Sequence, residues 1–269
     1  MKARIQLMGI INLTPDSFYA PSRIAGTEAL ERRVREMLQG GADILDFGAS
    51  STRPGAEMVA PAEEWRRLEG ALRSIRKAFP EERISVDTYH SEIVRRCYDT
   101  IGPFLVNDIS GGQLDPAMLE TVGSLSLPYV AMHMSGTPRT MQTLTDYPDG
   151  VVAELQRYFE DFGERAANAG IRDWILDPGF GFAKTREQNW ELLRHLGEFR
   201  RFHRPILVGL SRKSMLGAAP ENALEATLDA ERLALEQGAE ILRVHDVAAA
   251  KALIQAGPYC PMDGGWESD

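Results

Sequence analysis

The sequence predicts a closed (β/α)8 barrel in a single domain, and three observations support this fold. Short apolar runs rich in β-branched residues alternate with longer amphipathic segments along the chain. Eight such runs occur, each followed by a candidate helix, and this strict alternation predicts a parallel sheet. A length of 269 residues, 43% of them hydrophobic, suits one barrel. The alternative, an open doubly wound sheet, is disfavoured because no G-x-G-x-x-G motif follows the first run.

The predicted strands are the short apolar runs. They cover Ile5–Ile11, Ala42–Phe47, Arg83–Val86, Phe104–Val106, Tyr129–Met132, Trp174–Leu176, Ile206–Leu210 and Ile241–Val244. The predicted helices lie between them, and in the first, Thr27–Gln39, four apolar residues share one face. The others cover Ala62–Ala78, Ser91–Tyr98, Asp115–Val122, Val151–Ala169, Glu187–Arg200, Ala223–Gln237 and Val247–Gln255. We therefore expect one barrel over residues 1–256, and a mobile tail over residues 257–269, where apolar periodicity is lost.

Composition excludes several classes of protein. A net charge of −9 argues against a surface that coats nucleic acid, so any positive charge for an anionic ligand has to be local. Two cysteines, Cys97 and Cys260, do not make a disulfide framework. The apolar stretch near the N-terminus has only seven residues; it is too interrupted for a signal peptide and far too short for a membrane span. We expect a soluble cytoplasmic protein with small-molecule partners and no membrane or nucleic-acid partner.

A barrel of this kind places its chemistry at the C-terminal ends of the strands and in the loops that follow. Each predicted strand end carries polar or charged groups. They are Asn12, Asp46 with the Ser50–Gly55 loop, Asp87, Asn107 with Asp108, His133, Asp177, Ser211 with Lys213, and Arg243 with His245. A single polar residue at a strand end is most often a turn or cap residue. Polar groups at all eight ends indicate a site.

The carboxylates and amides among these residues favour a flat heterocycle as ligand. Asp177 ends the run WILDPGFGF, and a buried carboxylate can accept two parallel hydrogen bonds from a ring edge of the guanine or pterin type. Asn107 can both donate and accept. Gly179 and Gly181 would let backbone approach a ring, and Phe180 or Phe182 could cover it. The alternative is that Asp177-Pro178-Gly179 is only a turn.

The cations favour a phosphate. Arg53, in the second loop, and Arg243 could each bind a phosphate with a bidentate fork. Arg243 lies inside an apolar strand, so it needs an anion, either a protein carboxylate or a ligand. His245 could instead be a core histidine. The run LVGLSRKSML should open a helix, or a turn into one, where exposed backbone amides and the Ser214 hydroxyl suit a carboxylate, with Lys213 beside the ring pocket. The alternative is a solvated basic turn.

Eight separated segments then resemble one known family, the dihydropteroate synthases. In order they are MGIINLTPDSF, STRPGA, SVDT, NDISGG, MHMSGTPRTMQ, ILDPGFGFAKT, GLSRKSML and LRVHDV, between Ile5 and Gln255. The resemblance implies a (β/α)8 barrel that joins p-aminobenzoate to 7,8-dihydropterin-6-ylmethyl diphosphate. It also implies release of pyrophosphate, use of Mg²⁺, and a homodimer formed through helices late in the barrel.

The resemblance assigns residues to three subsites. The pterin is expected at Asp87, Asn107, Met132, Asp177, Lys213 and Arg243, of which all but Met132 form the expected catalytic set. The diphosphate is expected at Asn12, Thr52, Arg53, Arg243 and His245, with Asn12 also near Mg²⁺. The p-aminobenzoate is expected among Phe18, Arg53, Pro54, Phe182, Lys213 and Ser214.

Two loops depart from the family pattern. Members often carry an acid soon after the phenylalanine of the first loop, whereas here Phe18 is followed by Tyr19-Ala20-Pro21. Asp16 is the candidate to steady a cationic intermediate in its place. In the second loop the usual glutamate is replaced by Ser50. The STRPGA run is unaltered, so we expect a sulfonamide to compete with p-aminobenzoate.

Two rival functions remain open at this point. A methyltetrahydrofolate-dependent methyltransferase shares the pterin barrel, but methyl transfer needs no pyrophosphate site. A pterin-binding protein without turnover is supported only by the two loop departures.

Overall fold

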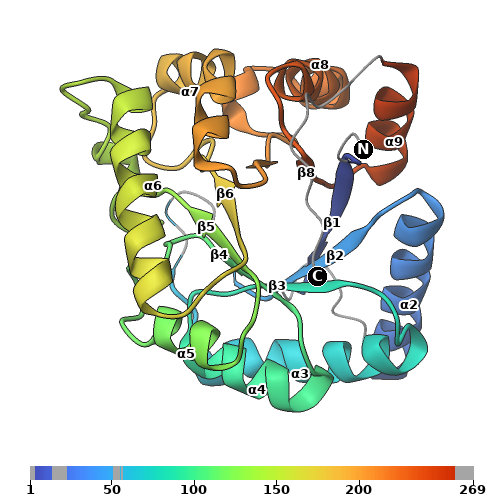
Figure 1. The fold of residues 1–269 in the computed structure, drawn as a ribbon. Helices are drawn as coiled ribbons and strands as arrows, with labels where there is room; N and C mark the ends of the chain where they lie inside the picture. The colour runs from blue at the N-terminus through green and yellow to red at the C-terminus, as the bar shows by residue number, and fades with distance from the viewer. Residues whose placement is uncertain (1–3, 14–22, 51–54, 56, 258–269) are drawn as a thin grey trace.

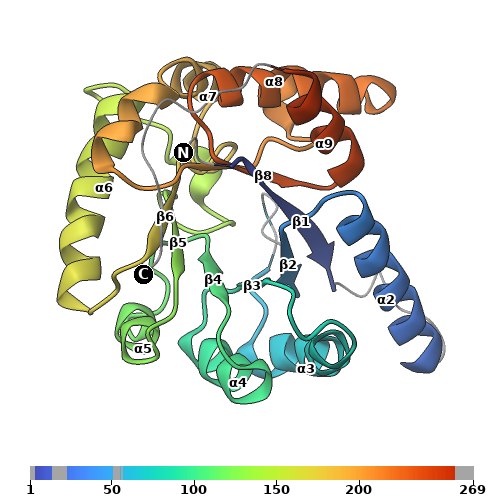
Figure 2. The same ribbon diagram turned by 45° about the vertical axis from the view of Figure 1, so that its right-hand side comes forward.

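The computed structural model is a ring of parallel strands surrounded by helices (Figure 1). It describes residues 4–13, 23–50, 55 and 57–257. The helices follow one another around the strands in chain order, from α2 to α9 (Figure 1). The same ring is visible when the molecule is turned by 45° (Figure 2).

The strands form one sheet whose hydrogen-bonded order is β6-β5-β4-β3-β2-β1-β8-β7. They are β1 (Gln6–Asn12), β2 (Ile44–Gly48), β3 (Ile84–Asp87), β4 (Leu105–Asp108), β5 (Tyr129–Met132), β6 (Trp174–Asp177), β7 (Leu207–Val208) and β8 (Ile241–Val244). β1 pairs with both β2 and β8, and the ring closes where Leu176 bridges to Ile206. The predicted (β/α)8 barrel is confirmed, and the open doubly wound sheet is wrong.

The helices that cover the strands match the predicted segments closely. They are α2 (Arg23–Gln39), α3 (Pro61–Ala78), α4 (Ser91–Ile101), α5 (Met118–Ser124), α6 (Val151–Asn168), α7 (Arg186–Arg194), α8 (Ala223–Glu236) and α9 (Val247–Ala256). Four short 3-10 helices, η1 (Met141–Thr143), η2 (Leu196–Phe202), η3 (Ser214–Leu216) and η4 (Pro220–Asn222), are also present among the described residues.

Among the elements whose bounds differ from the predicted ranges, three do so for identifiable local reasons. β7 is shorter than Ile206–Leu210, because the Leu210 carbonyl already accepts the Lys213 amide in a turn. The predicted helix Glu187–Arg200 divides into α7 and η2; Gly197, a poor helix former, lies in the second part. α5 begins late, since the Asp115 carboxylate accepts the Ser91 and Ala117 amides and holds a turn before it.

Two layers of apolar side chains fill the molecule. The inner layer lies within the ring of strands and takes one residue from each of seven strands: Met8, Ile44, Leu105, Val130, Ile175, Leu207 and Ile241. The outer layer lies between strands and helices, where Leu7 and Ile11 of β1 join Val34 and Met37 of α2 in one cluster. A Cβ on Gly9 would lie 3.1 Å from the Met37 sulfur, so glycine lets α2 pack closely on β1.

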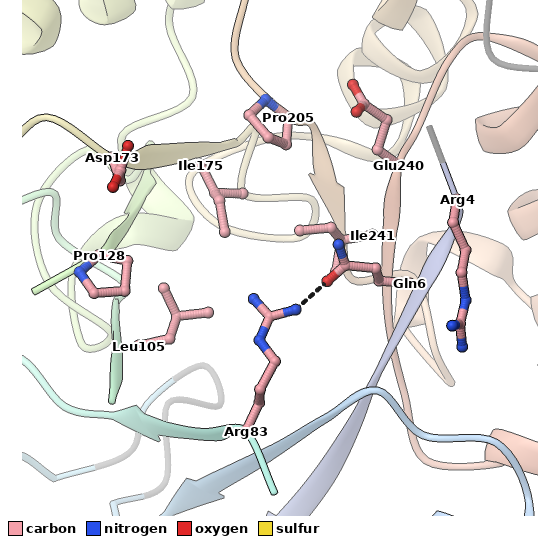
Figure 3. A pocket seen from close by; sticks show the side chains of 10 residues that line it. All are labelled: Arg4, Gln6, Arg83, Leu105, Pro128, Asp173, Ile175, Pro205, Glu240 and Ile241. Carbon is pink, nitrogen blue, oxygen red and sulfur yellow. Dashed lines mark hydrogen bonds between the residues drawn. The ribbon is translucent and has the colours of Figure 1, made fainter. Parts of the chain in front are cut away.

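A cavity of about 340 Å³ opens at the end of the barrel where the strands begin (Figure 3). Leu105, Ile175 and Ile241 of the inner layer line it, and Arg83 donates to Gln6 Oε1 at 2.8 Å beside them (Figure 3). In barrels of parallel strands the chemistry lies at the opposite end. The site is therefore to be sought at the C-terminal ends of the strands. Within the described part of the chain, every helix is too short or too polar to cross a bilayer.

Candidate active site

Charged and amide side chains meet at the C-terminal ends of β2, β3, β4 and β8. Arg243 donates Nε to Asp46 Oδ2 and Nη2 to Asp87 Oδ2, both at 2.7 Å. The Asn107 amide donates to the two oxygens of Asp46 at 3.3 and 3.2 Å. The Ser85 hydroxyl donates to Asp46 Oδ1 at 2.6 Å. Parallel register places Asp46 beside Ser85 and Asp87 beside Asn107, which brings the group together. We call these five residues the arginine cluster.

The arginine cluster holds one cation between two carboxylates. Burial raises the pKa of Asp87 to about 7, although the charge of Arg243 opposes this shift. Burial alone would lower the pKa of Arg243, but the carboxylates of Asp46 and Asp87 outweigh it and raise that pKa. The guanidinium therefore stays charged between the two carboxylates. The anion that Arg243 needs is supplied by protein carboxylates.

A second group of side chains lies on β6 and on the segments after β6 and β7. Asp177 accepts the Gly179 amide through Oδ1 at 2.8 Å, which leaves Oδ2 unused by that bond. Lys213 donates Nζ to the Phe180 carbonyl. The same ammonium lies 4.7 Å from the centroid of the Phe182 ring, in cation–π geometry. A carboxylate and an aromatic face are thus grouped around the Lys213 cation.

Lys213 and Asp177 influence each other's ionisation. Burial lowers the pKa of Lys213 to about 8, and the carboxylate of Asp177 opposes this shift. Burial also raises the pKa of Asp177, opposed first by Lys213. Arg243 acts electrostatically on both residues, so the two groups belong to one site.

Gly179 and Gly181 shape the segment after β6. Their φ values of +68° and +79° lie in the left-handed region, where side chains are strained. A Cβ on Gly179 would lie 2.1 Å from the His133 carbonyl oxygen, and one on Gly181 would lie 3.3 Å from Lys213 Cδ. The two glycines therefore permit close approach to β5 and to Lys213.

Comparison with known proteins agrees with this arrangement. The profile of the family described as "Pterin binding enzyme" matches residues 8–245. The chain belongs to this family. Among relatives named dihydropteroate synthase, that of Synechocystis is 40% identical over 253 residues, which covers 91% of this chain and 86% of the relative. That of Escherichia coli K12 is 41% identical over 247 residues, which covers 90% of this chain and 86% of the relative.

Solved structures of this pterin-binding family superpose on the barrel. Dihydropteroate synthase from Clostridium difficile, solved in the presence of pteroic acid, gives a TM-score of 0.87 at 32% identity and covers 94% of this chain and 96% of its own. The Thermus thermophilus enzyme, in complex with 4-aminobenzoate, gives 0.82 at 39% identity, covering 94% and 93%. The Yersinia pestis enzyme with a sulfonamide complex gives 0.85 at 36% identity, covering 94% and 92%.

Most of the predicted pterin residues lie in the two groups. Asp87, Asn107 and Arg243 lie in the arginine cluster, and Asp177 and Lys213 lie in the second group with Phe182. Met132, which is buried, ends β5 directly beside Asp177.

Three further predicted residues lie at strand ends around these groups. Asn12 is the half-buried last residue of β1, beside Gly48. His245 Nδ1 lies 3.0 Å from the Ser211 hydroxyl. Ser214 begins η3, a 3-10 helix of only three residues, after the turn that the Leu210 carbonyl closes with the Lys213 amide, so the predicted turn into a helix is present but short. The aligned amides of a long helix are absent there, which leaves the Ser214 hydroxyl and Lys213 as donors. Phe18, Thr52, Arg53, Pro54 and Asp16 lie outside the described residues.

Sequence reasoning missed several residues that build the site. Asp46 was recognised at a strand end but not assigned to the pterin pocket, although a carboxylate inside the run ILDF was a usable signal. His133 was recognised at a strand end but given no role, and its buried partner Lys184 was not singled out. In contrast, Asp108 serves the fold: it accepts hydrogen bonds from Ser110, Gly112 and Tyr129.

Proposed function

We propose that the protein acts as a dihydropteroate synthase. It would condense p-aminobenzoate with 7,8-dihydropterin-6-ylmethyl diphosphate to give 7,8-dihydropteroate and pyrophosphate. The observation that carries this proposal is the convergence of Asp87, Asn107, Asp177, Lys213 and Arg243 at one end of the barrel. The names of the relatives support it.

In this proposal, the pterin lies between the two groups. Asp177 Oδ2 accepts from the N–H and NH₂ edge of the ring, and the Gly179 amide holds Oδ1 in place. Asn107 completes a mixed donor and acceptor edge, and Met132 forms part of the wall. Because these side chains are buried, each hydrogen bond to the ring acts in a medium of low dielectric constant.

The diphosphate lies toward Arg243, Asn12 and His245, with Thr52 and Arg53 assigned from the sequence alone. Within the described residues, no group of three His, Cys, Asp or Glu side chains could hold a metal ion. A single amide oxygen of Asn12 fits Mg²⁺, which usually keeps waters and takes substrate phosphate oxygens as ligands. When bound, Mg²⁺ would offset the negative charge that develops on departing pyrophosphate.

The protein's own part in the reaction is to bind, to orient and to stabilise charge. Arg243 stays cationic and faces the charge that forms on the leaving group. The attacking amine of p-aminobenzoate is neutral at pH 7, so no strong general base is needed. The carbon attacked is a methylene conjugated to the pterin, which favours a dissociative path without a covalent enzyme intermediate.

The p-aminobenzoate lies against the Phe182 ring and beside Lys213, with its carboxylate at Ser214. Phe18, Arg53 and Pro54 complete this subsite from the sequence alone. Holding the amine close to the methylene carbon supplies much of the rate through orientation.

Pyrophosphate release with both substrates present tests the function directly. The proposal expects release that needs both p-aminobenzoate and the pterin diphosphate, and that a micromolar sulfonamide inhibits in competition with p-aminobenzoate. Pterin binding without pyrophosphate release would favour a binding protein without turnover. Methyl transfer from methyltetrahydrofolate would favour the methyltransferase.

We also propose a homodimer and a cytoplasmic location, both from the family resemblance. Light scattering coupled to size exclusion would test the first, with a mass of twice 29.9 kDa expected.

A further inference from the structure

Lys184 is a buried lysine to which the proposed subsites assign no substrate contact. Its side chain, 5% exposed, points back into the segment that follows β6. Nζ donates to the carbonyls of Gly179 and Phe182, both at 3.0 Å. It also lies 3.1 Å from His133 Nδ1 and 3.4 Å from the His133 carbonyl. One ammonium thus ties the segment 179–183 to itself and to the end of β5.

The segment 179–183 needs such ties because its backbone is unusual. Gly179, Gly181 and Ala183 all have positive φ, and for Ala183 the value is +48°. A non-glycine residue in this region is disfavoured on its own. Further bonds support the segment: Gly181 N–H donates to Asn189 Oδ1 at 2.7 Å, and the Tyr147 hydroxyl donates to the Ala183 carbonyl at 2.7 Å.

The same segment carries the wall of the proposed p-aminobenzoate subsite. The Phe180 carbonyl accepts Lys213, and the Phe182 ring faces the Lys213 ammonium. A shift of this backbone would therefore move both the aromatic wall and the cation. Lys184 bonds the Phe182 carbonyl itself, so its influence on this wall is direct.

The groups around Lys184 suit a hydrogen-bond donor at this position. Burial lowers the pKa of His133 well below its usual value, and Lys184 adds to that shift. His133 is therefore neutral, and its Nδ1 can accept from the ammonium. Burial also lowers the pKa of Lys184 to about 7, opposed by the carboxylate of Asp177.

We propose that Lys184 is a positioning residue that fixes the segment 179–183 and, through it, the Phe182 and Lys213 wall of the p-aminobenzoate subsite. This proposal rests on the proposed function. It assigns Lys184 no contact with either substrate.

Lys184→Met tests the proposal, because it keeps a long apolar stem and removes the donors. Hydrogen exchange followed by mass spectrometry would report on the amides of Gly179, Gly181 and Phe182, which are all hydrogen-bonded in the wild type. We expect their exchange to become at least about tenfold faster. We expect the KM for p-aminobenzoate to rise roughly five- to twentyfold, while the KM for the pterin diphosphate and kcat change less than about threefold.

Two further variants sharpen the test. Lys77→Met, at an exposed lysine of α3, is the matched control and should change neither exchange nor KM. Tyr147→Phe removes only the hydroxyl that bonds Ala183 and should produce a smaller change of the same kind, even if Lys184→Met does not fold.

The failures are distinguishable. Unchanged exchange over 179–183 in Lys184→Met, or equal increases in both KM values, would overturn the positioning role. A wild-type protein that releases no pyrophosphate would overturn the proposed function, and the exchange data would still decide whether Lys184 fixes the segment.

Discussion

Buried ionisable side chains in this barrel differ in whether they have hydrogen-bond partners. Asp46, Asp87 and Arg243 satisfy one another at the site. Glu231 of α8 is 2% exposed, yet neither carboxylate oxygen has a hydrogen-bond partner among the described residues. Burial raises its pKa to about 8, and Asp246 adds to the shift. The folded protein therefore keeps Glu231 protonated at pH values where the unfolded chain would ionise it.

Glu231→Gln should stabilise the fold in a pH-dependent way. The usual pKa of 4.5 is raised to about 8. The contribution of Glu231 to folding stability is therefore fully present below pH 4.5 and is lost as the pH rises to 8. We expect the variant to gain about 1–3 kcal/mol in free energy of unfolding at pH 8 and little at pH 5. Urea unfolding at both values measures this difference. Glu225→Gln, at an exposed position of the same helix, is the control. Equal gains at both pH values would contradict the assignment.

The proposed division of the site into subsites can be tested with two single substitutions. Asp177→Asn should mainly raise the KM for the pterin diphosphate, because it removes the charge that accepts from the ring edge. Ser214→Ala should mainly raise the KM for p-aminobenzoate. Each removes a hydrogen bond to a charged group, worth roughly 1.5–3 kcal/mol, or about tenfold to a hundredfold. Steady-state kinetics with each substrate varied in turn gives the comparison. If both variants affect both substrates equally, the subsites are wrongly divided.

At the scale of elements, the sequence was most informative where local pattern and tertiary structure agree. β5 and β8 have the predicted bounds, because buried parallel strands are continuous apolar runs. The limits of β7 could not be predicted. Leu210 is apolar like a strand residue but its carbonyl closes a turn with Lys213. That contact depends on the loop after the strand, which local apolar pattern does not describe.

The same limit explains which site residues the sequence could predict. Asp87 and Asp177 end their strands, Asn107 lies one residue before the end of β4, and the barrel topology alone brings strand ends together. Lys184 lies within a loop, and only the left-handed turn of Gly179 and Ala183 directs it inward. In the sequence, Asp46 could not be distinguished from the other polar residues at strand ends. Its central role follows from Arg243, which is 197 positions away in the sequence.

The loop after β4 provides a prediction about an element. Within this loop, the Asp108 carboxylate accepts hydrogen bonds from two backbone amides and from the Ser110 hydroxyl. It also accepts one from the hydroxyl of Tyr129 in β5, at an O···O distance of 2.6 Å. Tyr129→Phe removes the buried hydrogen bond from the tyrosine hydroxyl to Asp108, so we expect a loss of about 1–3 kcal/mol in free energy of unfolding. The KM values should stay unchanged, because Asp108 supports the loop and not the ligand. Thermal and urea unfolding would measure the loss; a variant as stable as wild type would show that the bond is dispensable.

Over the molecule as a whole, the barrel is thinnest between β6 and β7 among the described residues. β5 and β6 are joined along four residue pairs, whereas β6 meets the β7 side only at the bridge from Leu176 to Ile206 and at the bond from the Leu176 amide to the Pro205 carbonyl, within the described residues. β7 itself has two residues. We call this junction the β6–β7 seam. Since fewer hydrogen bonds hold it, the seam should open more readily than the rest of the ring.

The proposed pterin pocket spans the β6–β7 seam, which leads to a prediction for the whole barrel. Asp177 ends β6 and Lys213 follows β7, so a ligand that contacts both joins the two sides. Hydrogen exchange should be faster over residues 205–210 than over Tyr129–Met132 without ligand. Pterin binding should slow exchange at the seam more than at β5, because a ligand stabilises only the closed form that it contacts. In the Asp177→Asn variant, the same pterin should slow hydrogen exchange at the seam less than it does in the wild type. Equal exchange of both segments without ligand would contradict this prediction. So would pterin binding that slows exchange at the seam no more than at β5.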